Sequence, residues 1–172
     1  MKTLFLMRHA KSSWDDTALP DQDRPLNKRG ERDAPRMGER LAKRHIKADL
    51  ILSSPARRAL MTAKVIAKSI DYKPKRIVVE AQLYPGAVDD LLKLVHSLGK
   101  KQDRVMIVGH NPALMELAHR FSSEITRMPT CAVAEFTFAT KSWSLVDNSS
   151  LATVALEAPK KSKKFSWSNR LE

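Results

Sequence analysis

The sequence is poor in several features that mark particular classes of protein. Its single cysteine, Cys131, excludes an intramolecular disulfide and suits the reducing cytoplasm, where we expect the protein to reside. No apolar stretch approaches the roughly 20 residues of a membrane-spanning helix. The first apolar run, residues 4–7, is also shorter than the core of a secretion signal, which needs about 7 residues or more. We therefore expect a soluble protein that is neither secreted nor bound to a membrane.

Aromatic residues and metal-binding patterns are also scarce. Aromatic side chains make up 6% of the 172 residues. The basic residues are spread along the chain instead of alternating with aromatics in one stripe, which argues against nucleic acid as a partner. The sequence contains neither a His-Glu-x-x-His motif nor a pair of closely spaced cysteines. We therefore expect no metal ion and no organic cofactor.

Positive charge, in contrast, is abundant. With 31 basic and 19 acidic residues the net charge is +12, which favours an anionic partner. The length and the 42% hydrophobic content fit a single core and a single domain, which we place at residues 1–158, and we expect a monomer. Residues 159–172 carry four lysines and one arginine and have no periodic apolar pattern, so we expect a flexible basic tail.

Short apolar runs alternate with amphipathic stretches along the first two thirds of the chain. This pattern predicts strands at residues 3–8, 49–53, 76–79 and 104–108 and helices at residues 28–45, 56–70, 88–98 and 113–122. Such an order is typical of an α/β domain with a mainly parallel central sheet flanked by helices. Beyond residue 128 the period changes to two, through residues 133–138, Trp143, Leu145 and residues 152–156, which predicts short edge strands. We expect Cys131 to be a small apolar residue in the strand-like segment 130–133.

Two junctions between a strand and a helix share one design. In each, a strand ends, Ser54 or Asn111 is predicted to be the N-cap, and Pro55 or Pro112 takes the first helical position. The unpaired N–H groups of both helices would then face the carboxyl edge of the sheet, which favours an anion there.

The residues next to these junctions suit phosphoryl transfer. Arg8 and His9 end the first strand, Arg58 falls in the first turn of one helix, and His110 directly precedes the other. Two guanidinium groups neutralise and orient a phosphate. A neutral imidazole is a good nucleophile at neutral pH, and a second, protonated histidine would stabilise the charge of the transferring group. The four side chains are therefore predicted to converge on a phosphate.

Three ordered motifs resemble those of the histidine phosphatase superfamily. They are Arg8-His9-Ala10, the stretch from Ser54 to Ala63, and Gly109-His110-Asn111-Pro112. Ala10 in place of the more usual glycine, the stretch Asp23-Arg24-Pro25-Leu26 and the short chain resemble the SixA-type branch, the phosphohistidine phosphatases. The resemblance covers residues 2–157 and implies a three-layer sandwich like that of phosphoglycerate mutase.

The resemblance also implies a role for each matched residue. His9 becomes the nucleophile, Arg8 and Arg58 bind the phosphate, and His110 is the second histidine of the phosphate pocket. Arg58 is chosen over Arg57 because the arginine of the family directly precedes the alanine matched by Ala59.

The general acid of many family members has no counterpart here. Its glutamate follows a leucine after the third strand, whereas Leu83 is followed by Tyr84 and Pro85. An imidazole leaving group needs little protonation, unlike an alkoxide, so the sequence favours phosphohistidine or another activated phosphate as substrate. Other acidic residues nearby are weak alternatives as donors, and a solvated surface role is the competing interpretation for each: Glu80, Asp89 and Asp90.

The loop after His9 supplies further candidates. Ser12 and Arg24 are predicted to bind substrate, although Arg24 fits equally well in a salt bridge with a neighbouring aspartate, Asp21 or Asp23. Trp14 is read as either pocket lining or loop packing. Asn27 is the predicted N-cap of the first helix. The remaining histidines are assigned to capping or solvation and not to catalysis: His45, His96 and His119.

The expected substrate is a phosphorylated protein, such as a histidine-containing phosphotransfer protein, or a small phosphate ester. A short chain without long insertions suits a protein-borne phosphate in an open site. Two alternatives remain at this point: a general small-molecule phosphomonoesterase, and a non-catalytic protein that binds phosphorylated or polyanionic partners through the same arginines.

Overall fold

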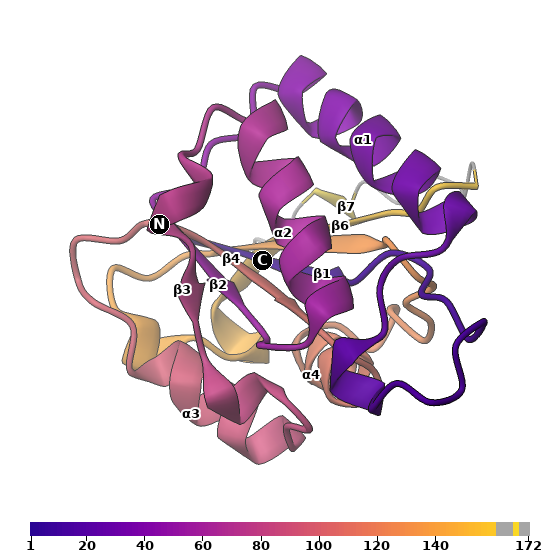
Figure 1. The fold of residues 1–172 in the computed structure, drawn as a ribbon. Helices are drawn as coiled ribbons and strands as arrows, with labels where there is room; N and C mark the ends of the chain where they lie inside the picture. The colour runs from indigo at the N-terminus through magenta and orange to yellow at the C-terminus, as the bar shows by residue number, and fades with distance from the viewer. Residues whose placement is uncertain (161–166, 169–172) are drawn as a thin grey trace.

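The structure is a computed structural model that describes residues 1–160 and 167–168. Seven strands form one sheet with the order β3-β2-β4-β1-β5-β6-β7 (Figure 1). The strands are β1 (Lys2–Arg8), β2 (Leu50–Ser53), β3 (Val78–Val79), β4 (Arg104–Gly109), β5 (Val133–Phe138), β6 (Leu151–Glu157) and β7 (Trp167–Ser168). The helices are α1 (Lys28–Lys43), α2 (Arg57–Ser69), α3 (Val88–His96) and α4 (Ala113–Phe121).

The sheet has a parallel half and an antiparallel half that meet at β1. Strands β3, β2, β4 and β1 run parallel, and β5 pairs antiparallel with the other side of β1. A strand in this central position is buried on both faces, which explains the continuous apolar run from Leu4 to Met7. In the register of β1 with β4, Arg8 lies opposite Gly109. The residues that follow, His9 and His110, therefore leave the sheet at the same level.

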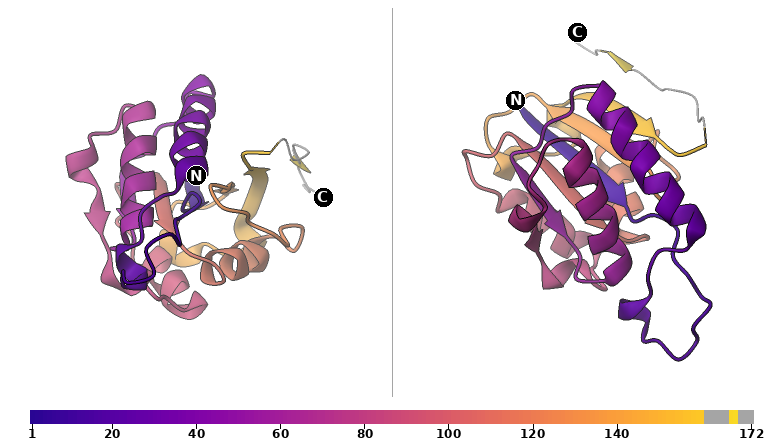
Figure 2. Two further views of the ribbon diagram at one scale, coloured as in Figure 1. Left: turned by 45° about the vertical axis from the view of Figure 1, so that its right-hand side comes forward. Right: turned by 45° about the horizontal axis from the view of Figure 1, so that its top comes forward.

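The two faces of the sheet are covered by different pairs of helices, giving three layers (Figures 1 and 2). Helices α1 and α2 pack on Phe5, Met7 and the residues that share their face, whereas α3 and α4 pack on Leu4 and Leu6. The alternation along β1 thus divides one strand between two cores. The predicted α/β fold with a mainly parallel central sheet is confirmed.

Several local predictions are wrong. Trp143 and Leu145 belong to a short 3-10 helix (Trp143–Leu145) and not to a strand. Cys131 is buried but lies outside β5, with a left-handed φ of 64°. The N-caps are Ala56 in α2 and Pro112 in α4. Both helices thus begin later than the Ser-Pro and Asn-Pro pairs suggested, because the chain needs extra residues to turn out of the sheet.

The expected basic tail is described only in part. Arg40 in α1 donates hydrogen bonds to the carbonyls of Ala158 and Pro159, at 2.7 and 2.8 Å, so the start of the segment is held against the domain. Strand β7 pairs antiparallel with β6. The rest of the predicted flexible tail, residues 161–166 and 169–172, lies outside the described residues.

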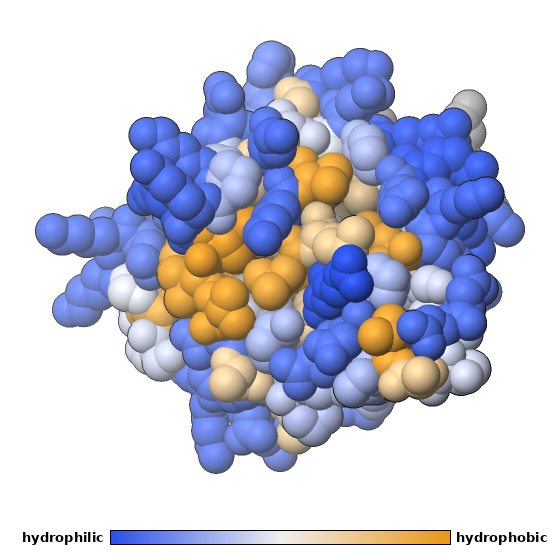
Figure 3. All heavy atoms as spheres, in the orientation of Figure 1, coloured by the Kyte–Doolittle hydropathy of each residue, from blue (hydrophilic) through white to orange (hydrophobic). Residues whose placement is uncertain are grey.

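The surface is mostly hydrophilic, in keeping with the charge of the chain. Figure 3 shows an apolar area within it, on the face where Figure 1 draws β3 and α2. The edge strand β3 contributes Val78 and Val79, which are 42% and 50% exposed. None of the helices in the described part of the chain is long and apolar enough to cross a lipid bilayer.

Candidate active site

His9 stands directly after β1, and its ring is fixed by the backbone of the next residue. Its Nδ1 lies 2.7 Å from the carbonyl oxygen of Ala10. A carbonyl only accepts hydrogen bonds, so Nδ1 carries the proton and the neutral ring keeps a lone pair on Nε2. The contact therefore sets the tautomer that a nucleophilic histidine requires.

The backbone around His9 is held from both neighbouring strands and from α2. The His9 N–H donates to the Gly109 carbonyl at 3.1 Å, and the His9 carbonyl accepts from the Cys131 N–H at 3.0 Å. The Ala10 N–H donates to the Thr62 hydroxyl at 3.0 Å. Ala10 is fully buried at this turn. His9 therefore has little freedom to move relative to β4, β5 or α2.

Two arginines, Arg58 buried and Arg8 half-buried, flank His9 and keep unused donors. Arg8 donates through Nη1 to the Met128 carbonyl at 3.1 Å, and Arg58 donates to the Asp21 carbonyl at 2.7 Å and to its carboxylate at 3.1 Å. The Nε atoms of both arginines are buried and have no hydrogen-bond partner among the described residues. Buried donors of this kind are costly unless they serve a ligand. Arg57, the alternative to Arg58, is exposed.

His110 lies beside His9 on the neighbouring strand end. The ring centroids are 5.1 Å apart, and Nε2 of His110 lies 2.7 Å from the Ser54 hydroxyl. The oxygen of this hydroxyl already accepts from the Ala56 N–H, so its own proton is available for Nε2. Ser54, expected to cap α2, instead positions a histidine.

Burial and neighbouring positive charge keep both rings neutral. Desolvation lowers the pKa of His9 to about 4, and the guanidinium groups of Arg58 and Arg8 add to the effect. Desolvation, followed by the interaction with His9 and the charge of Arg58, lowers the pKa of His110 to about 3. A neutral His9 suits a nucleophile. The expectation that His110 is protonated does not hold for the pocket by itself at pH 7.

These side chains line one pocket of about 460 Å³ at the carboxyl edge of the parallel strands. It brings together all four residues predicted to act on the phosphate, as well as the loop candidates Ser12 and Arg24. The Arg24 guanidinium donates to the Ser12 hydroxyl at 2.9 Å and pairs with Asp21 at 3.1 Å. Arg24 therefore forms the predicted salt bridge with Asp21 and also lines the pocket, whereas its binding to substrate stays a prediction.

Trp14 lies at the mouth of the same pocket. Its ring packs against the Arg24 guanidinium, 3.5 Å from the ring centroid, and its side chain is 67% exposed. An indole that covers a buried guanidinium excludes water from one side of it. Asn27 is the N-cap of α1, as predicted, and accepts from the Gly30 N–H at 2.9 Å.

Asp21 and Tyr84 are pocket residues whose roles the sequence did not reveal. The Tyr84 hydroxyl donates to the Asp21 carboxylate at 2.6 Å, and the Tyr84 ring meets the His110 ring edge-on, with centroids 5.4 Å apart. The hydrogen bond from Tyr84, together with Arg58 and Arg24, lowers the pKa of Asp21 to about 2. The only signal was indirect: Tyr84 lies next to Pro85, the position where an acid was sought.

The acidic residues considered as proton donors lie elsewhere. None of them lines the pocket: Glu80, Asp89 and Asp90. Asp89 pairs with Arg120 at 2.9 Å on the surface. Within residues 1–160 and 167–168, no group of three His, Cys, Asp or Glu side chains is arranged to hold a metal ion. The pocket is thus a set of cationic donors around two neutral imidazoles, with a single carboxylate that stays ionised.

Comparisons with known proteins agree with this geometry. A family model described as histidine phosphatase superfamily (branch 1) matches residues 4–84. An uncharacterized chloroplastic protein of Arabidopsis thaliana is 33% identical over 152 residues, which cover 83% of this chain and 69% of that protein.

Two solved structures assigned to phosphohistidine phosphatase SixA share the fold. The one from Agrobacterium tumefaciens is 27% identical, with a TM-score of 0.74, and the match covers 80% of this chain and 92% of that chain. The one from Nakamurella multipartitia has a TM-score of 0.79 over 93% of this chain and 97% of that chain. At a sequence identity of 22%, this second match supports the fold alone.

Proposed function

The chain belongs to the histidine phosphatase superfamily, and from this premise we propose that it hydrolyses phosphohistidine in a protein substrate. Nε2 of His9 attacks the phosphorus while the bond between phosphorus and the imidazole nitrogen of the substrate breaks. The released histidine takes a proton from solvent. Water then attacks the phosphorus of phospho-His9, which releases inorganic phosphate and regenerates the His9 imidazole.

The observation that carries the proposal is the pairing of a fixed nucleophile with unused cationic donors. The Ala10 carbonyl keeps the lone pair of His9 on Nε2, and the guanidinium groups of Arg8 and Arg58 line the same pocket. A phosphoryl group carries three terminal oxygens and nearly two negative charges, so it satisfies such donors well. A non-catalytic binder would need the arginines but not the histidine tautomer.

His110 gains a function once a phosphoryl group is close. Its pKa of about 3 reflects burial and nearby positive charge. A dianion between Arg8 and Arg58 cancels much of that charge and therefore raises the pKa of His110. As a hydrogen-bond donor to the transferring oxygens, His110 would then stabilise their charge in the transition state.

The choice of phosphohistidine as the substrate follows from which groups in the pocket can donate a proton to a leaving group. Asp21, its one carboxylate, has a pKa of about 2 and is ionised at neutral pH, so it has no proton to donate to a leaving group. An alkoxide needs such a proton, whereas an imidazole departs with little help. We propose a cytoplasmic phosphorylated protein as the substrate, such as a histidine-containing phosphotransfer protein.

The test compares leaving groups in the same enzyme preparation. We expect a protein phosphorylated on histidine to be dephosphorylated with a kcat/KM at least a hundredfold above that for an alkyl phosphate such as glycerol phosphate. Labelled substrate should leave an acid-labile, base-stable phosphate on the enzyme. The His9→Ala variant should carry no such label. Preference for the alkyl ester would replace the proposal with a general phosphomonoesterase, and tight binding without label would replace it with a binding protein.

A further inference from the structure

A second hollow adjoins the catalytic pocket and has no part in the chemistry described above. It has a volume of about 400 Å³, and its charged lining residues are Arg29, Arg127 and Lys160. Thr130 lines both this hollow and the catalytic pocket, so the two are neighbours across one residue. We call this second hollow the basic groove.

Every charged side chain that lines the basic groove is a cation. Arg29 contacts Asp33 at 3.5 Å within α1, whereas no ion pair is seen for Arg127 or Lys160 within residues 1–160 and 167–168. The three cations lie on separate segments of the chain, so no local sequence pattern predicts that they come together. An anionic ligand in the groove would meet positive charge from more than one side.

The walls of the basic groove are anchored to the rest of the domain. The Met128 carbonyl accepts from Arg8 at 3.1 Å and from the Asn111 amide at 2.9 Å, which fixes the loop between the groove and the catalytic pocket. On the other side, Arg40 holds the backbone just before Lys160. A groove with fixed walls needs little ordering when a ligand binds.

Apart from Thr130, the rest of the lining is apolar and includes Pro129, Leu156 and Pro159. A free phosphate ion has nothing to place on such a surface, and a nucleic acid would be better served by exposed aromatic rings beside the cations. A polypeptide segment with carboxylates and an apolar side chain matches both parts of the lining. Positive charge at the rim also favours its approach.

We propose that the basic groove binds an acidic segment of the protein substrate beside the phosphorylated residue, an inference that rests on the proposed function. The phosphoryl group occupies the catalytic pocket, the chain of the substrate passes Thr130, and its carboxylates meet Arg127 and Lys160. The groove therefore selects among phosphorylated proteins, whereas the catalytic pocket selects the phosphoryl group.

The test uses the full chain and two peptides phosphorylated on one histidine. One peptide carries glutamates and a leucine on each side of that histidine, and the other carries glutamines in place of the glutamates. We expect the acidic peptide to have a KM about five- to tenfold lower, as a few partly exposed ion pairs provide. The Arg127→Gln/Lys160→Gln variant should lose this preference and keep its kcat/KM for phosphoimidazole.

A matched variant separates local contacts from overall charge. Lys101→Gln/Lys141→Gln removes the same charge from two exposed lysines that line neither hollow. This variant should keep the preference for the acidic peptide within twofold, because charges beyond a Debye length of about 8 Å are largely screened at physiological salt. Equal losses in both double variants would overturn the proposal in favour of general electrostatic attraction.

Binding of the unphosphorylated acidic peptide, followed by fluorescence anisotropy, tests the groove without turnover. We expect weak binding that the Arg127→Gln/Lys160→Gln variant loses and the Lys101→Gln/Lys141→Gln variant retains. If no phosphohistidine probe is hydrolysed but this binding pattern holds, the proposed function fails while the groove stands. Equal binding of the acidic peptide and of a single-stranded oligonucleotide of the same charge would overturn the choice of a protein segment.

Discussion

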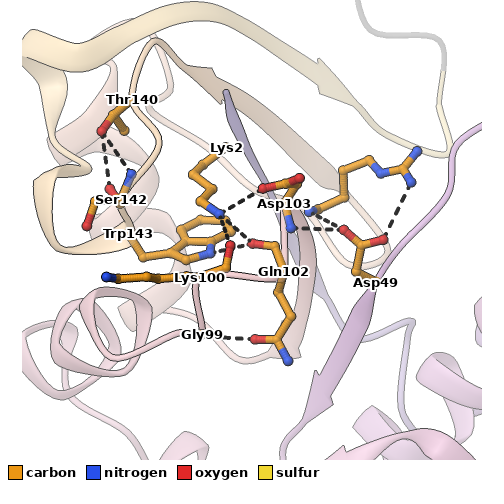
Figure 4. A network of polar contacts seen from close by, with 10 residues as sticks. Lys2, Asp49, Gly99, Lys100, Gln102, Asp103, Thr140, Ser142 and Trp143 are labelled. Atoms are coloured by element: carbon orange, nitrogen blue, oxygen red, sulfur yellow. Dashed lines mark hydrogen bonds and ion pairs between the residues drawn. The ribbon is translucent and has the colours of Figure 1, made fainter.

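The two ends of the central sheet each bury a cation, and they treat it in opposite ways. At the amino end the ammonium of Lys2 donates to the carbonyls of Lys100 and Gln102, at 2.8 and 3.0 Å, and to the carboxylate of Asp103 at 2.8 Å (Figure 4). All three donors of the ammonium are thus used. At the carboxyl end, Arg8 and Arg58 each keep a buried Nε–H that no described residue satisfies.

The difference separates a cation that is fully bonded within the protein from two that are not. The amino end is closed by further bonds, such as that from the Trp143 indole to the Gln102 carbonyl at 2.7 Å. Asp49 accepts from the backbone N–H groups of Asp103 and Arg104, both at 2.9 Å. Among the residues that the structure describes, no buried side-chain nitrogen or oxygen of Lys2, Asp49, Gln102, Asp103 or Trp143 lacks a hydrogen-bond partner. Satisfied donors stabilise the fold, whereas unsatisfied ones lower stability and are retained where a ligand completes them.

The largest expected effect comes from removing a cation at the carboxyl end. Arg8→Met should lower kcat/KM for a phosphohistidine protein by about 10²- to 10³-fold, because one set of donors to the phosphoryl group is lost. The free energy of unfolding should not fall, since the variant buries an apolar chain of similar length in place of an incompletely bonded guanidinium. Urea unfolding and steady-state kinetics on the same preparation measure both. A large loss of stability with activity retained would contradict the comparison.

Replacing the buried cation at the amino end by methionine should instead lower the stability and leave the activity unchanged. Lys2→Met removes the donor that the carbonyls of Lys100 and Gln102 share with the exposed Asp103 carboxylate, so we expect the free energy of unfolding to fall by about 1 kcal/mol. The kcat/KM should stay within twofold of the unchanged protein, because Lys2 lies at the far end of the sheet from His9. Loss of activity in a variant that unfolds at the original urea concentration would show that the two ends are coupled.

Acid should destabilise the protein through the histidines of the carboxyl end. The pKa values of His9 and His110, about 4 and about 3 in the folded protein, lie below the usual value of about 6.5 expected in the unfolded chain. The unfolded chain therefore binds more protons between about pH 3 and 6.5, and the free energy of unfolding falls as pH decreases through this range.

Urea unfolding at pH 7 and pH 5 checks this prediction. His110→Asn should lose less stability between the two pH values than the unchanged protein, because one of the two responsible groups is absent. Lys2→Met provides the control and should show the same pH-dependent loss as the unchanged protein. An equal loss in His110→Asn would mean that the acid sensitivity arises elsewhere.

The smallest expected effect concerns the hydroxyl of Tyr84. Tyr84→Phe removes the hydrogen bond to Asp21, which raises the pKa of Asp21 from about 2 toward its usual value. Asp21 stays ionised at pH 7 and keeps its contacts with Arg58 and Arg24, so kcat/KM should fall by no more than about threefold. A loss beyond a hundredfold would instead assign Tyr84 a direct part in the chemistry.

The sequence predicted best what depends on buried strands. The continuous apolar runs before His9 and His110 indicated parallel strands, and the ends of parallel strands meet at one edge of a sheet. Arg58 could be predicted as well, since it follows a strand closely. These residues reach the pocket through regular elements whose geometry is nearly the same in all proteins.

Contacts made by irregular segments were beyond prediction. Asp21 begins a short 3-10 helix (Asp21–Asp23), and nothing in its local sequence shows that it meets Tyr84 more than sixty positions away. Trp143 follows the period of a strand yet turns into a 3-10 helix to place its indole on the Gln102 carbonyl. Lys2 begins a strand, where a lysine is ordinarily exposed; its burial depends on acceptors about a hundred residues later.

The central position of β1 determines when His9 can reach its place in the pocket during synthesis. The strand is made first, but its partners are β4, where Thr3 lies opposite Arg104, and β5, where Lys2 lies opposite Phe138. A ribosome adds about 5–20 residues per second, so several seconds or more separate the synthesis of β1 from that of β4 and β5. His9 is therefore made before both partners of its strand and reaches its place between them only after they have been made.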